Sequence, residues 1–349
     1  IKELFRPRNQ GSVQVVPADG LTITGQYYLQ WEANRMPEPG TYLSQADFLG
    51  NGSETLLLAP GLPVRNAGDI EPRQAKDWGL AARWSPTWLE GTVGLYYRNF
   101  SDTGPQMHMT LVPTGFPPPG PPVMPGSYNW VYPSNIDLYG ISFAKQIFGI
   151  SVGSEFSYRK NMPLWGDPAM IAPGGALPAA GETFGARGDT MHALVNFLFT
   201  PGKTLLWDSA MIMSEFTWNR MDKVTQGAGL YKGRDSYTGI DRVSRDSYTG
   251  AFVFIPTWFQ VFPGVDLSVP TNGSIGLGGN SAVAGGGSKD SGNYSAGLAV
   301  DIDQKYNIKL AYTGFFGGYD SVGGVMTVPN GLGGMKDRDM VTLTLKATF

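Results

Sequence analysis

The sequence contains no cysteine and only two histidines, His108 and His192. Without cysteine the chain has neither disulfide bridges nor thiolate metal sites. A catalytic triad of the serine–histidine–aspartate type would have to use one of the two histidines, and no GxSxG nucleophile motif occurs. The HExxH pattern of metal-dependent hydrolases is missing as well. We therefore expect no enzymatic activity, no cofactor and no metal ion.

Long apolar runs are also absent, and charged residues make up only 16% of the chain. Mean hydropathy is -0.15, and no stretch approaches the ~20 apolar residues that a transmembrane helix needs. A helical membrane protein is therefore excluded. The net charge of -3 and the lack of a basic stripe give no indication of nucleic-acid binding.

Glycine, with 48 residues, and aromatic side chains, at 12%, are abundant instead. The last stretch of the chain has an alternating pattern. From Val341 onward, apolar Val341, Leu343, Leu345, Ala347 and Phe349 alternate with polar residues. A period of two predicts a strand with one apolar and one polar face. Such a strand closes an outer-membrane β-barrel, with Phe349 as the terminal aromatic signal for membrane insertion. The edge strand of a soluble β-sandwich is the alternative.

Similar alternation recurs along the chain in pairs of segments. The predicted strands are 12–16 and 21–32, 78–85 and 92–100, 136–146 and 150–159, 190–199 and 205–220, 248–262 and 265–277, 294–303 and 306–316, followed by the closing strand. Short connections alternate with long ones, and the longest span about 33–77, 101–135, 160–189 and 221–247. This asymmetry is typical of outer-membrane barrels, which have tight periplasmic turns and long extracellular loops.

The pattern predicts an all-β fold, a transmembrane antiparallel up-and-down β-barrel that forms one domain over residues 1–349. About 13 strands are recognisable from their alternation. Bacterial barrels have an even number of strands with both termini periplasmic, so the first recognisable strand runs inward and at least one outward strand precedes Ile1. We expect about 14 or more strands in the intact protein.

Several stretches resemble the domain-of-unknown-function 1302 family of Gram-negative outer-membrane proteins. They are GQYYLQWEANRMPEPGTYLSQAD (25–47), FSYRKNMPLW (156–165), ARGDTMHALVNFLF (186–199), LLWDSAMIMSEFTW (205–218), SRDSYTGAFVFIPTWFQVFPGVDLSVP (244–270) and DRDMVTLTLKATF (337–349). The hexapeptide RDSYTG occurs twice, at 234–239 and 245–250, and the second copy occupies the family position.

The resemblance implies a location in the outer membrane and a longer N-terminal part. It also implies two partners, a periplasmic lipoprotein and a resistance-nodulation-division-type exporter. The expected cargo is a lipid-like or aromatic molecule, and the family supplies no catalytic residues.

Two groups of side chains are candidates for a transport site. By alternation, charged residues of the strands point into the lumen, and the candidates for a constriction are Arg83, Arg98, Glu155, Arg159, His192 and Lys309. The simpler interpretation is that barrel interiors are polar in any case.

The second group lies in two loops, 103–134 and 161–186, which are rich in proline and methionine. Such apolar loops are unusual in a porin and indicate either a gate for a hydrophobic ligand or a structural plug. The candidates for the gate are Met107, Met109, Phe116, Met124, Trp130, Met162 and Trp165.

We therefore expect passage of a small hydrophobic or amphipathic molecule across the outer membrane. The alternatives are a porin for hydrophilic solutes and a plugged barrel that anchors an envelope complex.

Overall fold

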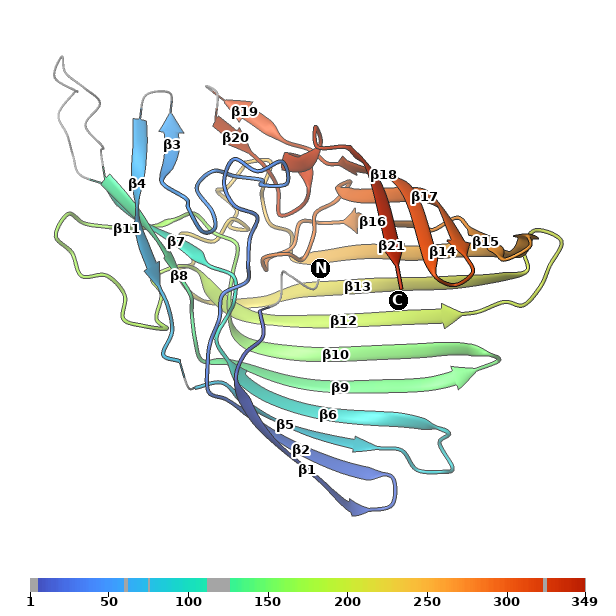
Figure 1. Ribbon diagram of the computed structural model, residues 1–349. Helices are drawn as coiled ribbons and strands as arrows, with labels where there is room; N and C mark the ends of the chain where they lie inside the picture. The colour runs from blue at the N-terminus through green and yellow to red at the C-terminus, as the bar shows by residue number, and fades with distance from the viewer. Residues whose placement is uncertain (1–5, 60–61, 75, 112–125, 323–324, 349) are drawn as a thin grey trace.

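The computed structural model describes residues 6–59, 62–74, 76–111, 126–322 and 325–348, and it is built almost wholly of β-strands. Its main feature is a sheet of 14 strands in which every neighbouring pair is antiparallel. Figure 1 shows this sheet as a broad, strongly curved wall, with short turns at one end and the long connections at the other. The predicted all-β class and its antiparallel arrangement are thus confirmed.

The strands of this sheet follow one another in chain order, apart from the strands of the long connections. They are β1 (Gln10–Ala18), β2 (Leu21–Tyr28), β5 (Trp78–Trp84), β6 (Gly91–Phe100), β9 (Ile136–Ile147), β10 (Ile150–Pro163), β12 (Arg187–Phe199), β13 (Ser209–Gln226), β14 (Asp246–Phe262), β15 (Val265–Ser268), β16 (Thr271–Gly278), β17 (Gly292–Ile302), β18 (Tyr306–Phe316) and β21 (Met340–Ala347).

Most predicted strands differ from the observed ones by a few residues at one end, and two differences have a particular cause or consequence. The stretch predicted as one strand over 265–277 is divided into β15 and β16 at Pro270, because proline has no N–H to donate to the sheet. The stretch predicted over 205–220 begins later, at Ser209, and Asp208 lies in the preceding turn. The irregularities in its pairing with β12 lie further along the strand, where its residues 221–226 are opposite residues 187–190.

The turn between β9 and β10 illustrates how the short connections work. Ile147 pairs with Ile150, so only Phe148 and Gly149 form the turn. Their φ angles are 49° and 80°, the left-handed values of a two-residue hairpin turn that suits the twist of the flanking strands. Glycine adopts this conformation without strain. Phe148 is a non-glycine residue at positive φ, and its side chain is 100% exposed.

The strands β1 and β21 are the two edges of the sheet. Within the described residues, β1 pairs only with β2, and β21 pairs only with β18. Along the path from β1 to β21 there are twelve antiparallel steps, if β15 and β16 are counted as one, so the two edge strands run in the same direction.

The long connections contain a second sheet that was not expected from the sequence. Its order is β11 (Ala169–Ile171), β7 (Gln106–Leu111), β8 (Gly126–Val131), β4 (Leu62–Ile70) and β3 (Thr55–Ala59). Two of its contacts, β11 with β7 and β4 with β8, are parallel pairings between connections that are distant in the chain. We call this sheet, together with residues 31–54, the cap.

The cap has its own hydrophobic core. Its buried members are Trp31, Val64, Met109, Tyr128, Trp130 and Tyr132. In Figure 1 the cap lies at the end of the main sheet opposite the short turns. Two smaller elements, β19 (Asp320–Val322) with β20 (Val325–Thr327) and the 3-10 helix η1 (Gly333–Met335), belong to the last long connection. No helix within the described ranges is long and apolar enough to span a membrane.

Candidate functional site

A cavity of about 1440 Å³ lies between the inner face of the main sheet and the cap. The strands β2, β5, β6, β9, β10, β12 and β13 contribute polar and charged side chains to its wall. The cap side is mainly apolar, with Met36, Leu43, Phe48, Leu49 and Trp130, although Ser44 and Gln45 also line it. The cavity therefore offers a charged surface on one side and an apolar surface on the other.

Five of the six charged candidates line this cavity: Arg83, Arg98, Glu155, Arg159 and His192. Alternate residues of a strand point to opposite faces of the sheet. The pairing registers of these strands place all five side chains on the inner face. Lys309 lies on the same face, paired with Ala299 and Thr344, but outside the cavity wall.

The registers arrange the charged candidates in two rows across the strands. In one row Arg83 is followed by Gly94, Ser142 and Glu155 on successive strands. In the other row Arg98 is followed by Leu138 and Arg159. The two rows are separated by the row that contains Tyr96, whose Oη lies 3.0 Å from Ser142 Oγ.

Of the five gate candidates that the structure describes, three lie inside the cap rather than on exposed loops. Met107, Met109 and Trp130 belong to β7 and β8, where Met109 and Trp130 are buried and Met107 packs on the same core. Of these three, only Trp130 lines the cavity. Phe116 and Met124 lie outside the described residues, as does Phe349.

The remaining two candidates pack elsewhere. Met162 is buried against Ile136 and Val283, at the end of the main sheet nearest the long connections. Trp165 packs beside Leu164 and also lines the cavity. Apolar residues of the loops therefore form structural cores, and two tryptophans of this set reach the cavity surface.

The segment 36–49 also lines the cavity, which the sequence did not predict. Phe48 stacks on Trp130 with ring centroids 6.1 Å apart. The Phe48 carbonyl oxygen accepts hydrogen bonds from Tyr128 Oη and Trp130 Nε1, both at 3.0 Å. The segment has no periodic pattern, so only contacts between distant connections place it beside β8.

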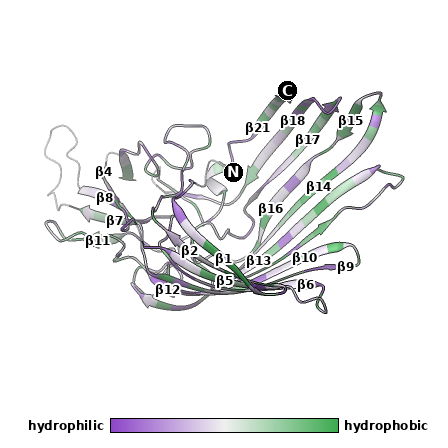
Figure 2. Ribbon diagram, turned by 60° about the horizontal axis from the view of Figure 1, so that its bottom comes forward, coloured by the Kyte–Doolittle hydropathy of each residue, from purple (hydrophilic) through white to green (hydrophobic). Residues whose placement is uncertain are grey.

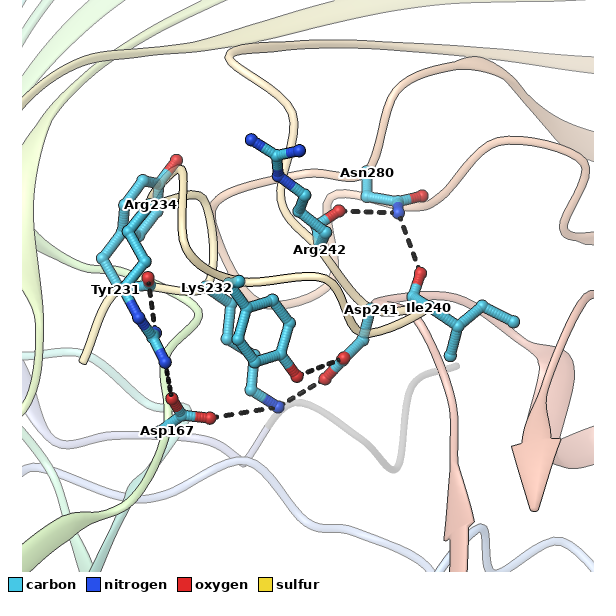
Figure 3. A network of polar contacts seen from close by, with 9 residues as sticks. Asp167, Tyr231, Lys232, Arg234, Ile240, Asp241, Arg242 and Asn280 are labelled. Atoms are coloured by element: carbon cyan, nitrogen blue, oxygen red, sulfur yellow. Dashed lines mark hydrogen bonds and ion pairs between the residues drawn. The ribbon is translucent and has the colours of Figure 1, made fainter. Parts of the chain in front are cut away.

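A second contact between connections is a polar network that reaches the cavity through Lys232 and Asp241. Figure 3 shows Lys232 Nζ directed between Asp167 and Asp241. Arg234 Nη2 donates to Asp167 Oδ2 at 2.7 Å, and Tyr237 Oη donates to Asp241 Oδ1 at 2.6 Å. Asp241 is only 2% exposed, so its charge depends on these partners. We call these residues the latch.

His108 is buried in the cap and takes no part in the cavity wall. Its Nε2 accepts a hydrogen bond from the Phe184 backbone N–H at 2.9 Å, which identifies a neutral imidazole. Burial lowers the pKa of His108 to about 4. Burial also raises the pKa of Asp102, although the backbone N–H groups of Gly104 and Thr103 and the charges of Arg159 and Arg187 oppose that rise.

Fold and site together define a class of protein. It is an all-β protein whose large antiparallel sheet carries a charged inner face under an apolar cap, with a cavity between them. The chain belongs to the family described as "Protein of unknown function (DUF1302)", whose model matches residues 1–349. A comparison with curated proteins found no match.

Proposed function

We propose that the main sheet is the wall of a β-barrel in the outer membrane of a Gram-negative bacterium. The observation that carries this proposal is the outer face of the sheet. Large apolar side chains remain exposed there on strand after strand: Val13, Ile23, Leu80, Leu95, Ile141, Phe156, Phe216, Phe252, Leu298, Leu310 and Leu343. A continuous apolar surface of this extent requires an apolar environment, and lipid supplies it. Figure 2 shows the apolar positions recurring along these strands.

Aromatic residues border this surface at both ends, as in barrels that cross a membrane. Near the cap, Trp78 and Tyr97 lie 5.1 Å apart between ring centroids, and Tyr97 and Tyr139 lie 5.2 Å apart. At the short turns, Trp88 and Phe148 are largely or fully exposed.

The distance between the two aromatic borders agrees with a bilayer. From Tyr139 to Phe148 the chain advances nine residues, or about 30 Å at about 3.4 Å per residue. A strand tilt of about 40° reduces this length to about 23 Å along the membrane normal. The apolar band of outer-membrane barrels is about 25 Å tall.

Closure of such a barrel requires more than the described strands. Because β1 and β21 run in the same direction, antiparallel closure needs an odd number of further strands between them. The path from β1 to β21 has an odd number of strands, so an odd number of further strands gives an even total. An even total of 14 or more is the number expected for a bacterial barrel.

We further propose that the barrel passes a small hydrophobic or amphipathic molecule, such as a lipid-like or aromatic compound, and that it is not an enzyme. The cavity supports this role, because the apolar cap wall faces a charged strand wall. A periplasmic lipoprotein and a resistance-nodulation-division-type exporter are the proposed partners, since a passive barrel needs an external source of energy for directed transport.

The test is transfer of a radiolabelled amphiphile into vesicles that contain the folded full-length protein, measured beside single-channel conductance. We expect transfer of dodecanol above that of empty vesicles, with no steady ion conductance. Steady conductance without transfer of the amphiphile would support a hydrophilic porin instead. Absence of both, in protein shown to be folded by heat-dependent gel mobility, would support a plugged structural barrel.

A further inference from the structure

Arg98 and Arg159 form a pair of guanidinium groups that have no ion-pair partner among the described residues. They lie on either side of Leu138 in one row of the sheet, so their Cα atoms are about 10 Å apart. Both line the cavity. Arginine stays protonated at any physiological pH, so the pair carries two permanent positive charges.

Aromatic rings and a hydroxyl group hold these two side chains, and no carboxylate does. Arg98 lies over the rings of Tyr28 and Phe100, with Cζ 5.2 Å and 5.0 Å from the centroids. Its Nε is buried without a hydrogen-bond partner among the described residues. Arg159 Nε donates to Ser157 Oγ at 3.3 Å. Rings fix the orientation of a guanidinium without cancelling its charge.

Three other partly buried arginines have acidic partners, whereas the buried Arg187 donates to the carbonyl oxygens of Ser134 and Asn161. Arg8 contacts the same Tyr28 ring as Arg98, and its Nη1 lies 3.0 Å from Asp77 Oδ2. Arg220 and Arg234 likewise form ion pairs with aspartates. Arg159 is within electrostatic range of Asp102 and Glu155, yet it forms an ion pair with neither of them. Within the described residues, the guanidinium groups of Arg98 and Arg159 thus have neither an ion-pair partner nor a carbonyl acceptor, and both line the cavity.

We propose that Arg98 and Arg159 bind the oxyanion headgroup, a carboxylate or a phosphate monoester, of an amphiphile whose apolar chain lies against the cap. This assignment rests on the proposed function and narrows its ligand to an anionic class. Guanidinium groups bind planar and tetrahedral oxyanions through paired N–H donors, which is the chemistry that both side chains present to the cavity. Phe48, Leu49 and Trp130 supply the apolar surface across the same cavity.

The experiment measures binding of radiolabelled dodecanoate, dodecyl phosphate and dodecanol to the full-length protein in lipid nanodiscs, corrected for empty nanodiscs. We expect both anions to bind more tightly than dodecanol, and the tighter of the two identifies the headgroup. Arg98→Gln and Arg159→Gln should each weaken anion binding about tenfold, because each removes charged hydrogen bonds. Dodecanol binding by these variants should stay within about twofold, which also shows that they are folded.

The matched control is Arg65→Gln, which removes an exposed arginine of the cap that does not line the cavity. Its affinity for dodecanoate should equal that of the parent protein. Equal affinity of the parent for dodecanol and both anions, or unchanged anion binding by both glutamine variants, would overturn the headgroup site and leave the amphiphile cavity standing. Binding of no probe above empty nanodiscs would overturn the proposed function together with the site.

Discussion

The rings of Phe48 and Trp130 stack with their centroids 6.1 Å apart, which ties the first long connection to the second sheet. Tyr128 and Trp130 strengthen this contact by donating hydrogen bonds to the Phe48 carbonyl oxygen. Because both rings also line the cavity, the same contact that stabilises the cap shapes the surface that a ligand would meet.

Replacement of Trp130 by alanine should loosen the cap. Trp130 is 7% exposed, and loss of a buried tryptophan costs about 3–5 kcal/mol. We expect faster hydrogen exchange over residues 106–111 and 126–131, measured by mass spectrometry, with unchanged exchange in β12 and β13. Leu177→Ala, at a side chain that is 48% exposed, is the control and should leave exchange in the cap unaltered. Unchanged protection in Trp130→Ala would contradict a packing role for this ring.

The stability of the cap should fall below neutral pH because of His108. Its pKa is about 4 in the folded cap and 6.5 when unperturbed, so the unfolded cap takes up a proton that the folded cap does not. Above pH 6.5 the two states are both neutral, and this group adds no pH dependence. Between pH 6.5 and 4 the free energy of cap unfolding should decrease by about 3 kcal/mol, and His108 adds no further loss at lower pH.

The measurement is hydrogen exchange of the cap at several pH values, corrected for the intrinsic exchange rate at each. His108→Gln is the comparison, because its amide oxygen can still accept from the Phe184 N–H while it cannot be protonated. The decrease should be absent in that variant. An equal decrease in both proteins would assign the effect to other groups.

A positive charge on the outer face should impair insertion, whereas one on the inner face should not. Leu310 lies on the outer face between Leu298 and Leu343 and is 52% exposed. In a bilayer, Leu310→Arg should destabilise the proposed barrel by about 2–4 kcal/mol. Thr342→Arg, one row away on the inner face, is the matched control. The readout is the fraction folded in vesicles by heat-dependent gel mobility, and equal fractions for the two variants would argue against a membrane-facing outer surface.

Replacement of Lys232 by methionine should destabilise the latch residues and the turns that carry them. In Lys232→Met, the Asp241 carboxylate would remain almost fully buried without an ion-pair partner, with one hydrogen bond from the Tyr237 hydroxyl, at a cost of about 3–5 kcal/mol. We expect faster hydrogen exchange over residues 227–243. Arg242→Gln breaks an exposed ion pair with Asp235, in which the nearest N–O distance is 3.7 Å, and should have little effect. Similar exchange in the two variants would show that the latch contributes no stability.

Much of the main sheet was predictable because its strands obey a local rule. Alternation of apolar and polar residues located strands such as β9, β18 and β21 within one or two residues, and placed Arg83, Arg98, Glu155, Arg159 and His192 on one face. The division of β15 from β16 at Pro270 was missed, although proline in a strand is a warning sign. The cap was missed because its strands are short and pair across connections that are far apart in the chain.

The hexapeptide RDSYTG shows most clearly the difference between what the sequence determines and what the tertiary structure decides. Its copy at 234–239 forms turns in which Arg234 and Tyr237 serve the latch, whereas the copy at 245–250 enters β14, where Asp246 pairs with Arg220. Identical residues thus adopt different structures, because the partners come from elsewhere in the chain. By itself the sequence determined which residues form the long strands and which of their faces is apolar, since period-two alternation is a local property. Only the tertiary structure decided how the connections pair into a cap over the cavity and which arginines remain without acidic partners, since both depend on contacts between distant segments.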